Sequence, residues 1–141
     1  MRISARNVLA GKVKEITKGA VNAQVMLTLD GGEEMVAIIT NSSVESLGMT
    51  VGSGAFAIVK ASDVIVGKGL DGVRLSARNI LAGVVSSVQD GAVSSEVEIR
   101  LPGGTTVVAS ITKESVSALA LKSGDAVFAV VKASNVMLGV S

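Results

Sequence analysis

The sequence predicts an all-β protein made of two tandem OB-like five-stranded barrels, each with one short helix. Three observations predict this class. The second half of the chain repeats the first, apolar and polar residues alternate along most of each half, and one short helical stretch falls between the third and fourth expected strands. A sandwich built from the same strands is the alternative arrangement.

The chain is a duplication with a shift of 72 residues. Residues 2–69 align with residues 74–141 without a gap, and 32 of the 68 pairs are identical. This period is too long for a solenoid repeat, so we expect two copies of one small domain. We place the domains at residues 1–68 and 73–141, with the glycine-rich stretch 67–72 at their junction.

The first three strands of each copy follow from alternation and turn residues. Residues 8–17 alternate loosely and contain several β-branched side chains, and Gly19 ends this strand. Residues 21–29 alternate strictly, as expected for a strand with one buried face. The turn Asp30-Gly31-Gly32 predicts a hairpin to a third strand over residues 35–39.

A short helix and two further strands complete each copy. Thr40 is a candidate N-cap, and Val44 and Leu47 lie three residues apart, so we expect a helix that ends near Gly48. Its counterpart spans residues 112–119. The last two strands are expected at residues 56–60 and 64–66, with an interruption at residues 61–63.

The composition argues against several classes of function. The chain has no Cys and no His, which removes thiol chemistry, cysteine-ligated metal sites and the usual general base, so an enzyme is the least favoured class. A net charge of +1 and an aromatic content of 1% argue against a nucleic-acid binder. We expect no membrane partner, because the longest apolar run covers only residues 126–131 and the N-terminus lacks a signal-peptide core.

The apolar content predicts an oligomer. Barrels of about 70 residues are marginally stable alone, and only two Phe are available to fill two of them. With 48% hydrophobic residues, part of the apolar surface should be buried elsewhere. We therefore expect a homo-oligomer, and a monomer whose two barrels pack on each other is the alternative.

The polar residues that occur in both copies predict an anion site. The acidic residues do not repeat, whereas the repeated polar residues are all able to donate hydrogen bonds, which suits an oxyanion. Each one has an ordinary structural explanation when taken singly, such as a surface ion pair, an edge-strand lysine or a helix cap. The repeated pairs include Ser4/Ser76, Arg6/Arg78, Asn7/Asn79, Thr40/Thr112, Ser43/Ser115, Lys60/Lys132 and Ser62/Ser134.

A second candidate site lies at two small-residue turns. Small side chains at residues 19–22 and 91–94 allow a ligand or another backbone to come close, and around a three-fold axis their N–H groups could face an anion. A bulged strand start explains the same residues without a ligand. The turns consist of Gly19, Ala20, Val21 and Asn22 in the first copy and Gly91, Ala92, Val93 and Ser94 in the second.

These motifs resemble a known family. The first copy contains Gly19-Ala20-Val21-Asn22-Ala23, of which Gly-Ala-Val returns in the second copy. Three further motifs return in the same order, namely Ser4-Ala5-Arg6-Asn7, an Ile-Thr pair before the helix and Lys60-Ala61-Ser62. Together they resemble the molbindin (Mop/TOBE) family in its tandem di-Mop form, over essentially the whole chain. The resemblance implies an OB-like barrel per copy and a cytoplasmic homotrimer that binds molybdate or tungstate, with no other cofactor and no metal-cation site.

The resemblance also implies where the anion binds. In one type of site, Ser4 and Arg6 come from one domain, and Thr40, Ser43, Lys60, Ala61 and Ser62 come from its neighbour. The second copy would contribute Ser76, Arg78, Thr112, Ser115, Lys132, Ala133 and Ser134. The other type of site would lie on a three-fold axis at the two small-residue turns, where Ser94-Ser95 replaces Asn22-Ala23 in the second copy.

The leading functional hypothesis is a molybdate store or homeostasis buffer. The alternative is a regulatory oxyanion-sensing module that acts through a protein partner. The absence of a phosphate-binding loop and of a further helical domain in this sequence favours storage. The sites consist of donors without a repeated carboxylate, which suits a fully deprotonated dianion better than partly protonated phosphate.

Overall fold

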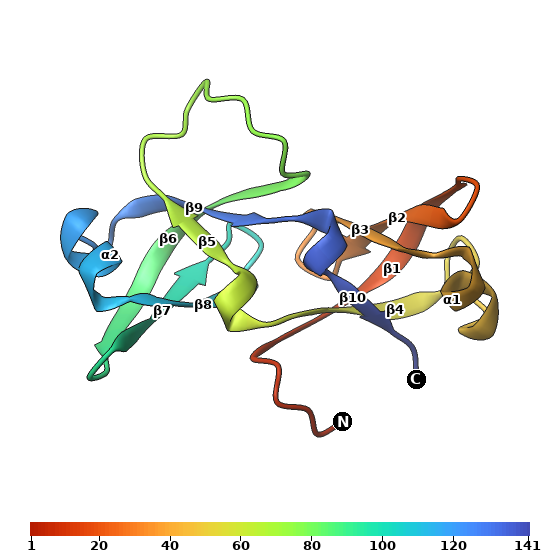
Figure 1. Ribbon diagram of the computed structural model, residues 1–141, viewed down its shortest axis with the longest axis horizontal. Coiled ribbons are helices and arrows are strands. Elements are labelled where there is room, and N and C mark those ends of the chain that lie inside the picture. The colour runs from red at the N-terminus through yellow and green to blue at the C-terminus, as the bar shows by residue number, and fades with distance from the viewer.

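Two five-stranded antiparallel sheets form the two lobes of the molecule (Figure 1). The computed structural model describes residues 1–141, and each half runs strand, strand, strand, helix, strand, 3-10 turn, strand. The first half contains β1 (Asn7–Lys18), β2 (Asn22–Leu29), β3 (Glu34–Thr40), α1 (Asn41–Ser46), β4 (Gly54–Val59), η1 (Ala61–Asp63) and β5 (Ile65–Gly67). The second half contains β6 (Asn79–Asp90), β7 (Ser94–Arg100), β8 (Thr106–Thr112), α2 (Lys113–Ala118), β9 (Ala126–Val131), η2 (Ala133–Asn135) and β10 (Met137–Gly139).

The predicted class is confirmed: each half is all-β apart from one short helix and the 3-10 turn. Strict alternation in β2 places Val25, Leu27 and Leu29 in the core and leaves the intervening residues partly exposed. The looser pattern of β1 has a local cause, since the register with β2 shifts between Val13 and Glu15. Such a bulge moves the following side chains to the opposite face of the strand.

The short helix begins where the sequence predicts. The Thr40 Oγ1 atom accepts a hydrogen bond from the Ser43 backbone N–H at 3.1 Å, and Thr112 does the same for Ser115 at 3.1 Å. Each helix has only six residues and buries little, so neither is long and apolar enough to cross a membrane.

The last strand of each half belongs to the sheet of the other half. The strand order is β10-β4-β1-β2-β3 in one sheet and β5-β9-β6-β7-β8 in the other. Met137 on β10 pairs with Ile58 on β4, and Ile65 on β5 pairs with Val130 on β9. In Figure 1 the blue C-terminal strand therefore lies in the lobe of the red and orange strands, and the yellow-green β5 lies in the other lobe. The repeats in the sequence are thus contiguous, whereas the sheets are not.

This exchange gives the two halves a common core. One apolar cluster of 27 buried residues extends through both lobes. It includes Val64, which directly precedes β5, and Val66, which lies within β5. The edge strands β3 and β10 also contact each other, so the sheet curls toward a barrel without a closing ladder of hydrogen bonds. Neither sheet is complete, and neither core is fully covered, without residues from the other repeat.

Candidate functional site

Strand register brings two separated motifs together. Asn7 at the start of β1 pairs with Val59 at the end of β4, so the residues before Asn7 and after Val59 leave the sheet side by side. The same register pairs Asn79 with Val131 in the second half. The segments that meet are therefore Ser4-Ala5-Arg6 with Lys60-Ala61-Ser62, and Ser76-Ala77-Arg78 with Lys132-Ala133-Ser134.

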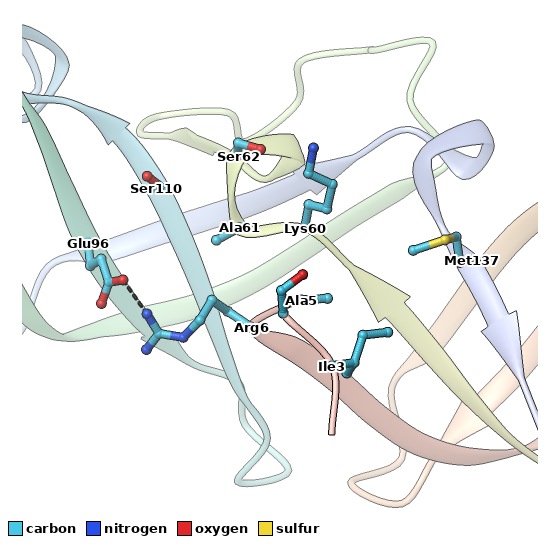
Figure 2. Close-up of a pocket in the computed structure, with 10 residues that line it drawn as sticks. Ile3, Ala5, Arg6, Lys60, Ala61, Ser62, Glu96, Ser110 and Met137 are labelled. Atoms are coloured by element: carbon cyan, nitrogen blue, oxygen red, sulfur yellow. Dashed lines mark hydrogen bonds and ion pairs between the residues drawn. The ribbon is translucent and has the colours of Figure 1, made fainter. Parts of the chain in front are cut away.

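The first of these meeting points is a surface cavity of about 430 Å³, which we call the Arg6 cavity (Figure 2). The sequence-predicted residues Ser4, Arg6, Lys60, Ala61 and Ser62 all line it. Lys60 precedes η1 with an extended backbone, and Ala61 is buried beneath the turn. The remaining lining residues are Ile3, Ala5, Glu96, Ser110 and Met137.

The second meeting point is a smaller cavity of about 150 Å³, which we call the Arg78 cavity. It holds the repeat-equivalent residues, together with Ala77 and with Ile38 from the first half. The sequence-predicted lining residues are Ser76, Arg78, Lys132, Ala133 and Ser134.

The third side of each site comes from the opposite repeat. Glu96 on β7 and Ser110 on β8 are cross-strand partners, and both line the Arg6 cavity. Arg6 Nη1 donates a hydrogen bond to the Glu96 carboxylate and forms an ion pair with it, as the dashed line in Figure 2 shows. At the equivalent place, Arg78 Nη1 donates to the Gln24 Oε1 atom at 2.7 Å.

Glu96 corrects one expectation. The repeated polar residues predict a site without a carboxylate, yet a carboxylate lines the Arg6 cavity and is paired with its arginine. The sequence comparison of the two copies missed Glu96 because its counterpart is Gln24, so the acidic residue does not repeat. Alternation along β7 marks Glu96 as outward-facing, but only the packing of the two lobes shows that this face borders Arg6.

The helix residues do not reach these cavities within one chain. The Thr40 and Ser43 hydroxyl oxygens lie 2.8 Å apart at the start of α1, and those of Thr112 and Ser115 lie 2.8 Å apart at the start of α2. None of the four lines the Arg6 or the Arg78 cavity. By contrast, Lys60, Ala61 and Ser62 share their cavity with Ser4 and Arg6 of the same repeat, although the resemblance assigns the two groups to neighbouring domains.

The helix starts lie beside the small-residue turns instead. The Asn41 backbone N–H donates to the Val21 carbonyl at 2.8 Å, and the Asn41 side chain donates to the Gly19 carbonyl at 2.9 Å. Each turn is closed by a hydrogen bond from its glycine N–H, at 2.7 Å from Gly19 to Asn22 and at 2.9 Å from Gly91 to Ser94. Ala20 lies in the first of these turns, on the exposed surface.

The second turn opens onto a hollow of its own. A cavity of about 700 Å³ is lined by Ala92, Val93 and Thr112, together with Lys113, Glu114 and Ser117 of α2. The valines at the two tips, Val21 and Val93, are 69% and 80% exposed, which leaves them free for contact with another molecule.

The repeated asparagines are structural rather than ligand-binding. Asn7 and Asn79 are 1% and 2% exposed, and both ends of each side-chain amide are occupied by backbone groups of the opposite half. No group of three or more His, Cys, Asp or Glu side chains that could hold a metal ion is found. Both cavities present fixed cations and hydroxyl donors, which suit an anionic ligand, and the Arg6 cavity adds the Glu96 carboxylate.

Comparison with known proteins places this geometry in a family. A family model described as the TOBE domain matches residues 3–66 and again residues 75–138. The chain belongs to the TOBE domain family. Both matched segments coincide with the two repeats, so the protein carries two TOBE (Mop) domains in tandem.

Relatives of this tandem TOBE chain are named for molybdenum. The molybdenum transport protein ModE of Herbaspirillum seropedicae is 43% identical over 140 residues, which cover 99% of this chain and 52% of ModE. The molybdenum-pterin-binding protein MopA of Rhodobacter capsulatus is 41% identical over 138 residues, which cover 98% of this chain and 52% of MopA. The chain thus spans about half the length of these curated relatives.

A solved structure matches the whole tandem TOBE chain. The cytoplasmic molybdate-binding protein ModG, in a crystal form with molybdate bound, superimposes with a TM-score of 0.97 at 48% sequence identity. The match covers 100% of both chains, so the exchanged arrangement of two five-stranded sheets is shared along the full length.

Proposed function

We propose that this tandem TOBE protein binds molybdate, with the Arg6 and Arg78 cavities as two of its sites. The observation that carries the proposal is the convergence in each cavity of one Arg, one Lys and two Ser from two segments of the same repeat. The full-length similarity to a molybdate-binding protein supports the same ligand class. The residues proposed to hold the anion are Ser4, Arg6, Lys60, Ala61 and Ser62, and Ser76, Arg78, Lys132, Ala133 and Ser134.

The donor set fits a tetrahedral dianion. Arginine offers two parallel N–H groups, lysine offers a compact positive charge, and the two serine hydroxyls can each donate to an oxyanion. Phosphate at neutral pH carries a proton that needs an acceptor, and the Arg78 cavity has no carboxylate to supply one. The cavity chemistry therefore favours fully deprotonated oxyanions, among which tungstate is the closest analogue of molybdate.

The finer role proposed is molybdenum storage and homeostasis in the cytoplasm. In a homotrimer, the start of α1 from one chain can approach a cavity of the next, which would bring Thr40 and Ser43, or Thr112 and Ser115, to the anion. The exposed turns at residues 19–22 and 91–94 would then meet at the three-fold axis as a second type of site. The alternative role is that of a regulatory oxyanion-sensing module that acts through a protein partner.

Titration calorimetry tests the ligand. The intact chain is titrated with sodium molybdate in chloride buffer, and sodium tungstate, sulfate and phosphate are compared at the same ionic strength. Binding of molybdate at two or more ions per chain, with phosphate at least tenfold weaker, is the expected result. Absence of heat and of competition with any oxyanion overturns the proposal.

A pair of double variants tests the location. R6A/R78A removes one arginine from each cavity, and we expect it to weaken molybdate binding at these sites by about tenfold or more, because each loses a charge-assisted donor. R2A/R74A removes the same charge from the same segments, four residues earlier, at positions that line neither cavity. Equal molybdate binding by the two double variants contradicts the assignment of the anion to these cavities. Light scattering of the intact chain separately tests whether it forms a trimer.

A further inference from the structure

The two cavities differ in the residues that the opposite repeat contributes. Both have the same Ser, Ala, Arg and Lys residues from their own repeat. The Arg6 cavity borders the cross-strand pair Glu96–Ser110, whereas the equivalent pair beside the Arg78 cavity is Gln24–Ile38. The duplication has thus kept the cationic residues and changed the residues that face them.

This change gives the two cavities different net charges. Arg6 and Lys60 share their cavity with a carboxylate, whereas no acidic residue lines the Arg78 cavity beside Arg78 and Lys132. Outside the cavity linings, Asp63 in η1 is also replaced by the neutral Asn135 in η2. The Arg6 cavity is therefore the less positive of the two.

The partners of the arginines also differ. Arg6 is held by the Glu96 carboxylate, so an anion that takes Arg6 must separate an ion pair and then lie beside the negative charge that remains. Arg78 is held by a neutral amide at 2.7 Å, and separating that hydrogen bond leaves no charge behind. The amide can also turn its NH₂ group toward a bound anion, which a carboxylate cannot do.

We infer that the Arg78 cavity is the stronger oxyanion site and fills first, and that Glu96 makes the Arg6 cavity the weaker site, which fills later. This inference rests on the proposed function and adds an order of filling to it. A carboxylate about 6 Å from a dianion in water-like surroundings weakens binding about tenfold. Ser110 adds one neutral donor to the Arg6 cavity, so the effect of Glu96 alone is larger than the difference between the sites.

Nuclear magnetic resonance can follow each cavity separately through the Nε–H signal of its arginine. The signals of Arg6 and Arg78 are assigned with R6K and R78K and then followed during titration of the intact ¹⁵N-labelled chain with sodium molybdate at constant ionic strength. We expect the midpoint for Arg78 at a molybdate concentration several-fold below that for Arg6, because Ser110 offsets part of the roughly tenfold effect of Glu96. An equal or lower midpoint for Arg6 overturns the inference.

Reciprocal variants test the cause. E96Q should move the Arg6 midpoint toward that of Arg78, and Q24E should raise the Arg78 midpoint about tenfold. E98Q is the matched control, because Glu98 lies two residues along β7 on the same face and lines neither cavity. If E96Q changes the Arg6 midpoint no more than E98Q does, Glu96 does not set the difference and the inference fails.

Failure of the proposed function has a different signature. If calorimetry shows molybdate binding but neither arginine signal moves, the anion binds elsewhere, and both the location and the filling order are wrong. If calorimetry shows no binding, the ligand itself is wrong. If both signals move at the same concentration in every variant, the proposed function stands and only the filling order is overturned.

Discussion

The side-chain amide of Asn7 hydrogen-bonds to both backbone polar groups of Val108 on the opposite half of the molecule. Its Nδ2 atom donates to the Val108 carbonyl at 2.8 Å, and its Oδ1 atom accepts from the Val108 N–H at 2.7 Å. Asn79 does the same with Val36, at 2.8 Å and 2.7 Å. Because β8 and β3 are the edge strands of their sheets, each asparagine satisfies edge groups that would otherwise be buried without partners.

Removal of this amide should destabilise the fold. We expect Asn7→Ala to lower the free energy of unfolding by about 1–3 kcal/mol, because it leaves the N–H and carbonyl of buried Val108 unpaired. Asn7→Asp should cost at least as much, since its carboxylate accepts from the N–H but cannot donate to the carbonyl. Urea unfolding followed by circular dichroism measures both, with partly exposed Asn135→Ala as the control. A change below about 0.5 kcal/mol for Asn7→Ala contradicts this role.

The residue after the second helix should be improved by glycine. Ala120 has a φ of 48°, in the left-handed region, and its repeat counterpart is Gly48 with a φ of 61°. We expect Ala120→Gly to raise the free energy of unfolding by up to about 1 kcal/mol, and Gly48→Ala to lower it by about as much. Ala118→Gly inside α2 is the control and should destabilise. If Ala120→Gly destabilises the fold as the control Ala118→Gly does, glycine does not relieve backbone strain at position 120 and the prediction is wrong.

A single repeat should associate in pairs. In a fragment of residues 1–72, β4 lacks the partner β10, and Val64 and Val66 lose the opposite half that helps to bury them. A second copy can supply the missing strand by the same exchange, so we expect masses in multiples of two chains. Light scattering after gel filtration measures this, with the intact chain as reference. A folded, monomeric fragment contradicts the requirement for exchange.

The junction between the repeats should carry an acid-sensitive contact. The Lys68 ammonium lies 3.0 Å from the Asp125 carboxylate, and the Lys122 backbone N–H donates to it at 2.9 Å. The hydrogen bond from Lys68, followed by that from Lys122, lowers the pKa of Asp125 below its usual 3.8. Because the folded pKa is the lower one, Asp125 stabilises the fold above about pH 3.8 and loses this contribution as the pH falls through the folded value.

Thermal unfolding between pH 7 and pH 2 checks this dependence. Asp125→Asn should lower the melting temperature near neutral pH, and its difference from the parent protein should shrink toward pH 2. Asp71→Asn, at an exposed position in the same junction, is the control. A difference that stays constant across the whole range contradicts the assignment to Asp125 ionisation.

Local signals in the sequence were sufficient to predict the strands and the helix, and to identify the cavity residues that come from the cavity's own repeat. The alternation in β2, the cap at Thr40 and the turn before β3 all act over a few residues, and all three predictions are confirmed. The Arg and Lys of each cavity could be identified because they repeat, and strand register explains why they meet.

The relation between the repeats could not be read from the sequence. β5 and β10 have the same pattern of residues. Judged from that pattern alone, each strand could pair equally well with the edge of its own sheet or with the edge of the other sheet. Which edge it joins depends on the packing of the two lobes. The role of Glu96 was missed for the same reason, because its distance from Arg6 is set by a contact between repeats and by no pattern within either one.

The exchange of β5 and β10 also governs the order in which the protein can be completed during synthesis. β5 leaves the ribosome before its partner β9 has been synthesised. β4 can pair with β10 only after more than half of the chain has been synthesised beyond β4. The nascent first lobe therefore keeps an open sheet edge and an uncovered apolar face until β10 has been translated. The two lobes close together rather than one after the other, and during that interval neighbouring nascent copies can trade strands.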